Sequence, residues 1–336
     1  MDLGSILAAF AVFLFVVLFH ELGHFIAAKS VGIKVNEFAV GMGPAILKRQ
    51  RGETEYSLRL LPLGGYCAME GEDENSDDPR GFEQAKPLGR FLTIFAGPFM
   101  NILIAILVFT FYTAMIGKPV PIIKELVEGS PLAQTEIEPG DRILSINGQE
   151  LTGQDHLKDL VRQSEGNPIE IEYETTSGNR KNIQVQPKEE NGQYLLGFIA
   201  ETTYDDFFYF IRAGWMMTWQ TFISLFQIIG MLISGKLGLD AVSGPVAVIS
   251  TIGQAAKTGL ANLLYLTAYI SVNLAFFNLL PIPALDGSKL VFILLEKLRG
   301  KPLNKETEGK ITMVGFIFLL SLIFLVSIKD IMALFQ

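Results

Sequence analysis

The hydrophobic positions of this chain are concentrated in a small number of long runs that contain almost no charged residues. Four of these runs are each close to the ~20 residues that an α-helix needs to cross the hydrocarbon core of a bilayer. They cover residues 3–19 with an extension to 28, 93–116, 260–280 and 311–328. The pattern therefore predicts a polytopic α-helical membrane protein with about four transmembrane helices.

A fifth run, residues 213–234, is also uncharged, but it mixes apolar residues with two Trp, two Gln and several Thr and Ser. Such a mixture also suits an amphipathic helix that lies in the membrane interface. Basic residues help to decide between the two positions. They flank the segment after the first run and the segment before the last run, at Lys29, Lys34, Lys86, Arg90, Lys297, Arg299, Lys301, Lys305 and Lys310.

The positive-inside rule places both of these basic segments in the cytoplasm. An even number of crossings must then separate them, and the runs 93–116 and 260–280 already supply two. We therefore expect residues 213–234 to be interfacial or re-entrant and both chain ends to lie outside. A signal peptide is the alternative for the first run, but residues 1–5 carry an acid and no base, and no small-residue cleavage pattern follows.

The composition agrees with a membrane protein, because 49% of the 336 residues are hydrophobic and only 18% are charged. The mean hydropathy is +0.36. A net charge of −8 argues against a nucleic-acid partner. Cys67 is the only cysteine in the sequence, which excludes an intrachain disulfide and a cysteine-rich metal site.

Residues 119–201, between the second and third runs, have the mixed polar and apolar composition of a soluble domain. It contains Pro139-Gly140-Asp141 and Ile143-Leu144-Ser145-Ile146-Asn147-Gly148, and patterns for a helix over 155–164 and a strand over 168–175 follow. This string resembles a PDZ domain, whose members bind extended peptides by adding a strand to a sheet edge. His156 is expected on the surface of the predicted helix rather than at a metal.

The chain thus divides into four predicted parts. Residues 1–118 form a first membrane half, and residues 119–201 form the PDZ domain, which is of the α+β class. Residues 202–256 form an amphipathic or interfacial helical region, and residues 257–336 form a second membrane half.

The first run continues into His20-Glu21-Leu22-Gly23-His24, the one place in the sequence where two histidines lie four residues apart. Four residues are about one helical turn, so both imidazoles project from the same face and can bind one cation, with Glu21 beside them to transfer protons. The pattern can also arise by chance on an exposed helix, where it does nothing. Ionisable residues are costly in an apolar run, which favours a functional site.

A catalytic zinc needs a third protein ligand, and a carboxylate in or beside another apolar run must supply it. Asp286 is the candidate, because it follows Pro281 and Pro283 at a break in the third run. The same carboxylate could instead cap the helix predicted over 289–298.

The second run contains Gly97-Pro98 and Asn101 near its start. A membrane-spanning helix tolerates such residues when neighbouring helices satisfy the freed backbone groups. Two interpretations of Asn101 stay open, namely simple packing between helices and an interhelical hydrogen bond toward the site.

These motifs together resemble the site-2 protease family, in particular its bacterial RseP/RasP-type branch with a PDZ insert. The resemblance covers essentially the whole chain and rests on the order of five features: the histidine motif, Gly97-Pro98 with Asn101, the PDZ segment, Ser243-Gly244-Pro245, and Asn278 with Leu285-Asp286-Gly287. Larger members carry two PDZ modules, so a two-domain filter against bulky substrates is in doubt for this chain.

The resemblance implies a zinc-dependent intramembrane endopeptidase with one Zn²⁺ per chain. His20, His24 and Asp286 would hold the metal, and Glu21 would act as the general base. Asn278 would hold the substrate backbone or the oxyanion, or else would cap a helix break.

The resemblance also implies a setting. The protein would lie in the bacterial cell (inner) membrane, in contact with lipid, with its PDZ domain extracytoplasmic and its active site toward the cytoplasmic side. Its substrates would be the transmembrane helices of single-span proteins, of the anti-sigma factor type or remnant signal peptides. An upstream site-1-type protease would shorten them first.

Residues 55–68 alternate in part and are predicted to turn at Gly64-Gly65, next to Tyr66. In the family this position matches a membrane-associated, re-entrant β-hairpin, whose edge could hold an unwound substrate helix in extended form. An ordinary loop hairpin is the alternative. The acidic run over 70–78 is expected to be a solvated, mobile loop.

Two other classes of function compete with a protease. In a membrane scaffold the zinc would be structural, but a structural zinc needs four protein ligands and no general base, whereas this chain offers three ligands and Glu21. A metal-ion transporter would distribute polar residues along several spans, and here they are concentrated at one depth.

Overall fold

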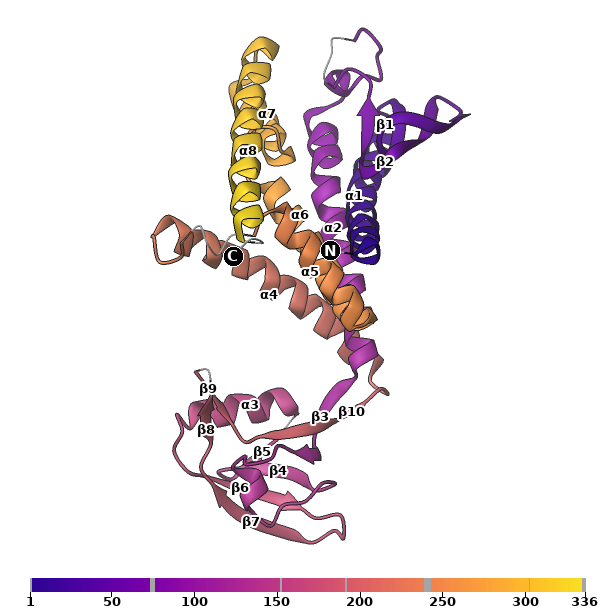
Figure 1. Cartoon of the computed structure of the whole chain (residues 1–336). Helices are drawn as coiled ribbons and strands as arrows, with labels where there is room; N and C mark the ends of the chain where they lie inside the picture. The colour runs from indigo at the N-terminus through magenta and orange to yellow at the C-terminus, as the bar shows by residue number, and fades with distance from the viewer. Residues whose placement is uncertain are drawn as a thin grey trace. The chain divides into compact units, whose positions relative to one another are not determined.

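The computed structural model describes residues 2–72, 76–151, 153–190, 192–238, 243–301 and 303–333 (Figure 1). The chain divides into two compact units. Met1–Tyr112 and Ile211–Gln336 form the first unit, and Thr113–Phe210 forms the second. The second unit contains the whole segment that the sequence assigns to a PDZ domain.

Long apolar helices dominate the first unit. Five of the described helices are long and apolar enough to cross a membrane: α1 (Leu3–Ser30), α2 (Pro87–Ile116), α4 (Phe207–Ile233), α6 (Leu260–Leu279) and α8 (Lys305–Ala333). All four predicted spans are therefore helical. The fifth helix, α4, covers the run 213–234 and has the same mean hydropathy as α6, 1.5. The count of about four crossings and the interfacial position of this run stay predictions.

The helix ends follow from local chemistry. Asp2 precedes α1, and its Oδ1 accepts a hydrogen bond from the Ser5 amide at 2.8 Å, which caps the first turn. The two prolines at 281 and 283 follow the end of α6, because proline cannot continue a helix, and lead into α7 (Asp286–Arg299). Helix α7 ends at Gly300 in the left-handed conformation, with a φ of 72°.

Apolar clusters hold these helices together. Helix α1 packs against α6 and the short helix α5 (Pro245–Thr258) through a cluster that contains Ala9, Val12, Val16 and Ile252. Helix α2 packs against α4 and α6 through a second cluster, whose fully enclosed members are Ala105, Phe109, Ala268, Val272 and Phe276. The outward faces of the same helices remain apolar, which suits contact with lipid rather than water.

Helix α8 is the least enclosed of the five, with 6% of its apolar window buried. It is tied to the start of α5 by one carboxylate. Asp330 accepts hydrogen bonds from the amides of Gly244 and Ala247 at 3.2 and 2.9 Å. The side chain of one helix therefore caps the exposed amides of another.

Beside α1 lies a curled antiparallel hairpin of β1 (Val35–Arg51) and β2 (Thr54–Met69), which closes at Gly52-Glu53 (Figure 1). An apolar cluster that includes Val35, Phe38, Ile94 and Leu290 packs it onto the helices. The sequence predicted a hairpin within residues 55–68, and this prediction is wrong in its pairing: these residues all belong to β2 and pair with β1, so the turn of the hairpin lies earlier in the chain.

The first residues of β1 have partners on both sides. Val40 is paired with Leu58 and also with Gly65, so β2 bends between these two positions. Gly64 allows the bend, because its φ of 72° is readily adopted only by glycine. Gly64-Gly65 is therefore a bend within the continuous strand β2, and not the hairpin turn that the sequence predicted. Residues 65–69 form the outer segment, and no other described strand pairs with their far edge.

The acidic run over 70–78 was expected to be a solvated loop, and the structure differs from this expectation in part. Residues 73–75 lie outside the described residues. Among the others, Glu70 and Asp78 both form ion pairs with Lys34, at 3.4 and 3.0 Å, and Glu72 pairs with Lys289 of α7 at 2.7 Å. The expectation of a freely solvated loop is therefore wrong for these three residues, because their basic partners lie far away in the sequence.

The second unit is an antiparallel sheet with one main helix, α3 (Gln154–Gln163). The strand order is β10-β3-β4-β6-β7, with β5 paired to β4. The strands are β3 (Lys118–Leu126), β4 (Arg142–Ile146), β5 (Gln149–Glu150), β6 (Ile169–Glu174), β7 (Arg180–Val185) and β10 (Phe198–Thr203), and a small separate hairpin joins β8 (Lys188–Glu190) to β9 (Gln193–Leu195).

Several sequence predictions for this unit are confirmed. The predicted helix over 155–164 and strand over 168–175 correspond to α3 and β6. Asn147 and Gly148 connect β4 to β5 with positive φ values of 50° and 76°, as a two-residue hairpin turn requires. His156 lies half-exposed on α3, within the second unit.

Candidate metal centre and active site

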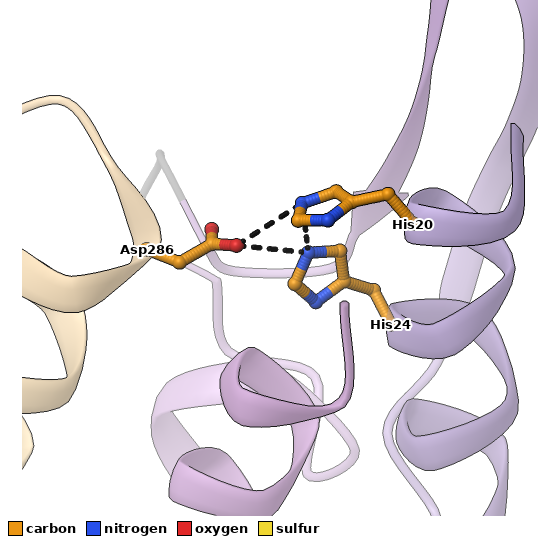
Figure 2. Close-up of side chains that lie close together, drawn as sticks. All are labelled: His20, His24 and Asp286. Atoms are coloured by element: carbon orange, nitrogen blue, oxygen red, sulfur yellow. Dashed lines mark hydrogen bonds and ion pairs between the residues drawn. The ribbon is translucent and has the colours of Figure 1, made fainter. Parts of the chain in front are cut away.

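Three metal-binding side chains meet inside the first unit. His20 and His24 project from one face of α1, and Asp286 faces them from the first position of α7 (Figure 2). Asp286 Oδ2 lies 3.1 Å from His20 Nε2 and 3.4 Å from His24 Nε2. The two Nε2 atoms are 3.2 Å apart. Both histidines are 6% exposed, so the cluster is enclosed by protein.

These separations fit a zinc ion. Ligand atoms that bind one zinc at ~2.0–2.2 Å with tetrahedral angles lie about 3.3–3.6 Å from one another, close to the three distances above. Asp286 Oδ2 is also buried, and it accepts no hydrogen bond of good geometry from the described residues. A buried carboxylate oxygen without a donor is costly, and a cation at this position would satisfy it.

The structure does not place Asp286 as the N-cap of α7. Asp286 is the first residue of α7, the N-cap position is Leu285, and no side chain caps this helix. The carboxylate instead faces α1, because the prolines after α6 turn the chain back toward the histidines.

His24 is oriented by the backbone of α2. Its Nδ1 lies 2.9 Å from the carbonyl oxygen of Thr93. A carbonyl oxygen can only accept, so Nδ1 donates its proton to Thr93, and the Nε2 lone pair is left to face the cluster. Sequence reasoning did not identify Thr93, because a contact made by a backbone carbonyl leaves no signal in residue type.

Two glycines allow α1 and α2 to approach this closely. A Cβ atom built on Gly97 would overlap the His24 ring, and one built on Gly23 would overlap the backbone of Ala96. Small residues at a helix crossing permit such close contact in membrane proteins. Gly97 therefore belongs to the site as the residue that leaves room for the imidazole.

Asn101 lies one turn further along α2 and is fully buried. Its side-chain amide is 3.2 Å from Nδ1 of His20. Of the two interpretations that the sequence left open, the structure favours a polar contact with the site. Its backbone oxygen also accepts a hydrogen bond from Ser271 Oγ of α6 at 2.9 Å.

Glu21 is half-buried and lies within electrostatic range of His20, His24 and Asp286. It also lies against the outer segment of β2, since a Cβ built on Gly65 would be 3.7 Å from Glu21 Cγ. The candidate base is thus close both to the ligand cluster and to the outer segment of β2. Asn278 is half-buried in the last turn of α6, eight residues before Asp286.

The side chain of Tyr66 contacts polar residues of the same β1–β2 hairpin. Its hydroxyl donates a hydrogen bond to Glu37 Oε2 at 2.7 Å, and the Arg59 guanidinium lies 5.0 Å from the ring centre. Burial and the neighbouring Glu37 raise the pKa of Tyr66 to about 12, so the hydroxyl stays a donor at neutral pH. Only the backbone of Tyr66 lies along the outer edge of β2.

A comparison with known protein families agrees with this geometry. The model of peptidase family M50 matches residues 8–322. The chain therefore belongs to peptidase family M50, the site-2 proteases, and is a site-2-type zinc metalloprotease.

The relatives are of the RasP type. A protein of Clostridium perfringens that is named as a zinc metalloprotease is 38% identical over 330 residues, covering 97% of this chain and 98% of the relative. Zinc metalloprotease RasP of Geobacillus kaustophilus is 30% identical over 417 aligned positions and 99% of each chain. The regulator of sigma-W protease RasP of Bacillus subtilis is 28% identical over 423 aligned positions and 100% of each chain.

Among solved structures, the PDZ domain of an SdrC-like protein from Listeria monocytogenes matches 25% of this chain and 86% of its own. The identity is 17% and the TM-score is 0.22. A TM-score this low carries no argument about the fold, so the PDZ assignment of the second unit rests on the sequence motifs.

Proposed function

We propose that this protein cleaves single-span membrane proteins within or at the edge of the membrane, with one zinc ion held by His20, His24 and Asp286. The observation that carries the proposal is the ligand cluster itself: two histidines on the apolar helix α1 and one carboxylate at the start of α7 place three potential ligand atoms close together. Idle ionisable groups are costly in such surroundings, so a cluster of this kind is expected to serve a function.

The depth of the cluster supports an active site near the cytoplasmic boundary. His20 follows the start of α1 by 17 residues, which at ~1.5 Å per residue is roughly 26 Å along a hydrocarbon core of about 30 Å. With the N-terminus outside, the site lies close to the inner interface, where water can reach it.

The chemistry divides among the residues as follows. Zinc held by His20, His24 and Asp286 would polarise the scissile carbonyl and would lower the pKa of its water toward about 7. Glu21 accepts the proton of the attacking water and passes it to the leaving amide nitrogen. Asn278 holds the substrate backbone or the oxyanion of the tetrahedral intermediate.

A helical substrate must first be extended, because its own hydrogen bonds shield the scissile peptide. The outer segment of β2, residues 65–69, offers an unpaired strand edge beside Glu21. We propose that the unwound substrate adds to this edge as a further strand, which brings its carbonyl groups to the metal site. Gly65 keeps this segment close to β1, because a Cβ built there would lie 2.6 Å from the carbonyl oxygen of Ala39.

The substrate class follows from the relatives. One relative is named as a regulator of sigma-W protease. We therefore propose substrates of the anti-sigma factor type, or remnant signal peptides, after an upstream site-1-type protease has removed their outer part. The single PDZ unit would lie outside the cytoplasm and restrict access for uncut proteins.

The first test compares wild type with Glu21→Gln on a model single-span substrate in detergent, with bound zinc measured in both. We expect the variant to keep its zinc and to lose cleavage by at least 100-fold, since general-base catalysis contributes about 10²–10⁴-fold. Glu128→Gln, an exposed acid of the second unit, is the matched control. If wild type binds zinc but cleaves none of several substrates, the scaffold reading replaces this proposal.

The orientation is tested with introduced cysteines, because the native Cys67 is buried. Lys158→Cys in the second unit and Lys301→Cys after α7 are both exposed positions. A membrane-impermeant maleimide added to intact spheroplasts should label the former and spare the latter. The opposite pattern would reverse the proposed topology.

A further inference from the structure

The two histidines of the cluster are oriented by different kinds of group. Nδ1 of His24 donates to the backbone carbonyl of Thr93, and Nδ1 of His20 faces the side-chain amide of Asn101. A ring that binds a metal through Nε2 must carry its proton on Nδ1 and needs an acceptor there. Thr93 supplies such an acceptor to His24 under all conditions, because a carbonyl oxygen cannot donate.

Asn101 can act in either sense. With its Nδ2 toward His20, at 3.2 Å, the amide donates, and the proton of a neutral imidazole moves to Nε2, where it would block the metal. Rotation of the amide by 180° exchanges the two atoms, so that Oδ1 accepts from Nδ1 and Nε2 is free. The contact distance is the same in both orientations.

The amide of Asn101 is buried, and His20 contacts one of its two ends. Asn101 is 0% exposed, and its Oδ1 is buried without a hydrogen-bond partner among the described residues. Rotation would give Oδ1 the Nδ1 proton as a partner and leave Nδ2 in its place, so burial does not select between the two orientations. A metal bound to Nε2 selects the accepting orientation, because the ring must then carry its proton on Nδ1.

We propose that Asn101 is a positioning residue for the metal centre, whose Oδ1 accepts the Nδ1 proton of His20 and thereby presents Nε2 to the zinc. It does for His20 what the carbonyl of Thr93 does for His24. This inference rests on the proposed zinc site and adds the group that sets the zinc affinity.

Two isosteric variants separate acceptor from donor. Asn101→Asp keeps an acceptor and removes the donor, whereas Asn101→Leu removes both and keeps the branched shape and the number of heavy atoms. Zinc affinity of the full-length chain in detergent is measured by competition with a chromogenic chelator at fixed pH. We expect Asn101→Leu to bind zinc about 10–100-fold more weakly, which is the usual loss when such a partner is removed, and Asn101→Asp to stay within about threefold of wild type.

Ser271→Ala is the matched control, because Ser271 bonds the backbone oxygen of Asn101 and not its amide. It should leave zinc affinity unchanged. The proposal is overturned if Asn101→Leu binds zinc as tightly as wild type, or if Asn101→Asp loses as much affinity as Asn101→Leu.

A spectroscopic readout keeps the test open if the variants do not fold. In zinc-loaded wild type with ¹⁵N-labelled histidine, Nδ1 of His20 should carry a proton and Nε2 should show metal coordination. An unprotonated Nδ1 would overturn the inference. If wild type binds no zinc at all, the proposed function fails too, whereas intact zinc binding with an indifferent Asn101 overturns only this inference.

Discussion

Nδ1 of His24 lies 2.9 Å from the carbonyl oxygen of Thr93, a residue 69 positions later in the chain. This contact fixes the imidazole of α1 against the backbone of α2, at a helix crossing where Gly23 and Gly97 leave room. The metal centre therefore depends on how closely two helices approach, as well as on its ligands.

The first prediction concerns that approach. Gly97→Ala should lower zinc content by at least tenfold, because the added methyl group overlaps the His24 ring and displaces it by more than a ligand site tolerates. Bound zinc per chain, measured on protein that elutes as a single species, checks this.

Gly89→Ala is the matched control on the same helix. A Cβ built there would meet Val31 at 3.6–3.8 Å, which is ordinary packing contact, so zinc content should not change. Full zinc occupancy in Gly97→Ala would contradict the close-approach argument.

Zinc removal should destabilise the folded chain. A ligand that binds only the folded state stabilises it by about 2.7 kcal/mol at a hundredfold excess over its Kd, and chelation removes this stabilisation. The melting temperature in detergent should fall on addition of a chelator and recover with added zinc.

Two variants separate ligand binding from proton transfer in the same assay. Glu21→Gln should respond to the chelator as wild type does, whereas His24→Ala should melt at one temperature with or without it. A chelator response that survives in His24→Ala would place the zinc elsewhere.

The contact between α8 and α5 should contribute to stability. Asp330 is 6% exposed and accepts hydrogen bonds from the amides of Gly244 and Ala247. Because it acts as a helix cap from a neighbouring helix, Asp330→Ala should cost about 1–2 kcal/mol of stability against denaturant.

Asp330→Asn retains an acceptor and should recover at least half of that loss. Equal losses in the two variants would show that the charge, and not the hydrogen bonding, ties α8 to α5.

The strand edge of β2 makes a prediction about substrates. If residues 65–69 receive an extended chain, a Gly or Pro substitution near the scissile bond should raise the cleavage rate, because it lowers the helix stability of the substrate by about 1–3 kcal/mol per residue. Initial rates for matched single-span substrates with Ala, Gly or Pro at one position measure this effect.

The control carries the same substitution at the far end of the substrate's transmembrane helix, where it should change the rate by less than twofold. Rates that are indifferent to helix propensity near the scissile bond would speak against strand addition.

Much of the first unit is predictable from the sequence for a simple reason. Long uncharged runs have few alternatives to a helix in a membrane, so all four predicted spans are found as helices. The histidine motif needs only helical periodicity to place His20 and His24 on one face. The turn at Asn147-Gly148 is likewise a local signal, since both residues accept positive φ.

Other features needed the fold. The sequence offered two roles for Asp286, and only the path after α6 shows that its carboxylate reaches the histidines. The ion pairs of Glu70, Glu72 and Asp78 with distant lysines were missed, because their partners lie far away in the chain. The length and composition of α4 do not predict whether it spans the bilayer or lies in the interface.

The sequence alone predicts the class of chemistry, through two histidines and a glutamate on an apolar helix, and it predicts the long apolar helices. The tertiary structure shows which carboxylate lies beside the two histidines, which groups contact the two imidazoles, and which strand segment lies against Glu21. The physical reason is that periodicity and composition act over a few residues. Ligand distances and hydrogen bonds depend instead on helices that meet through glycine, carbonyl and amide contacts from distant parts of the chain.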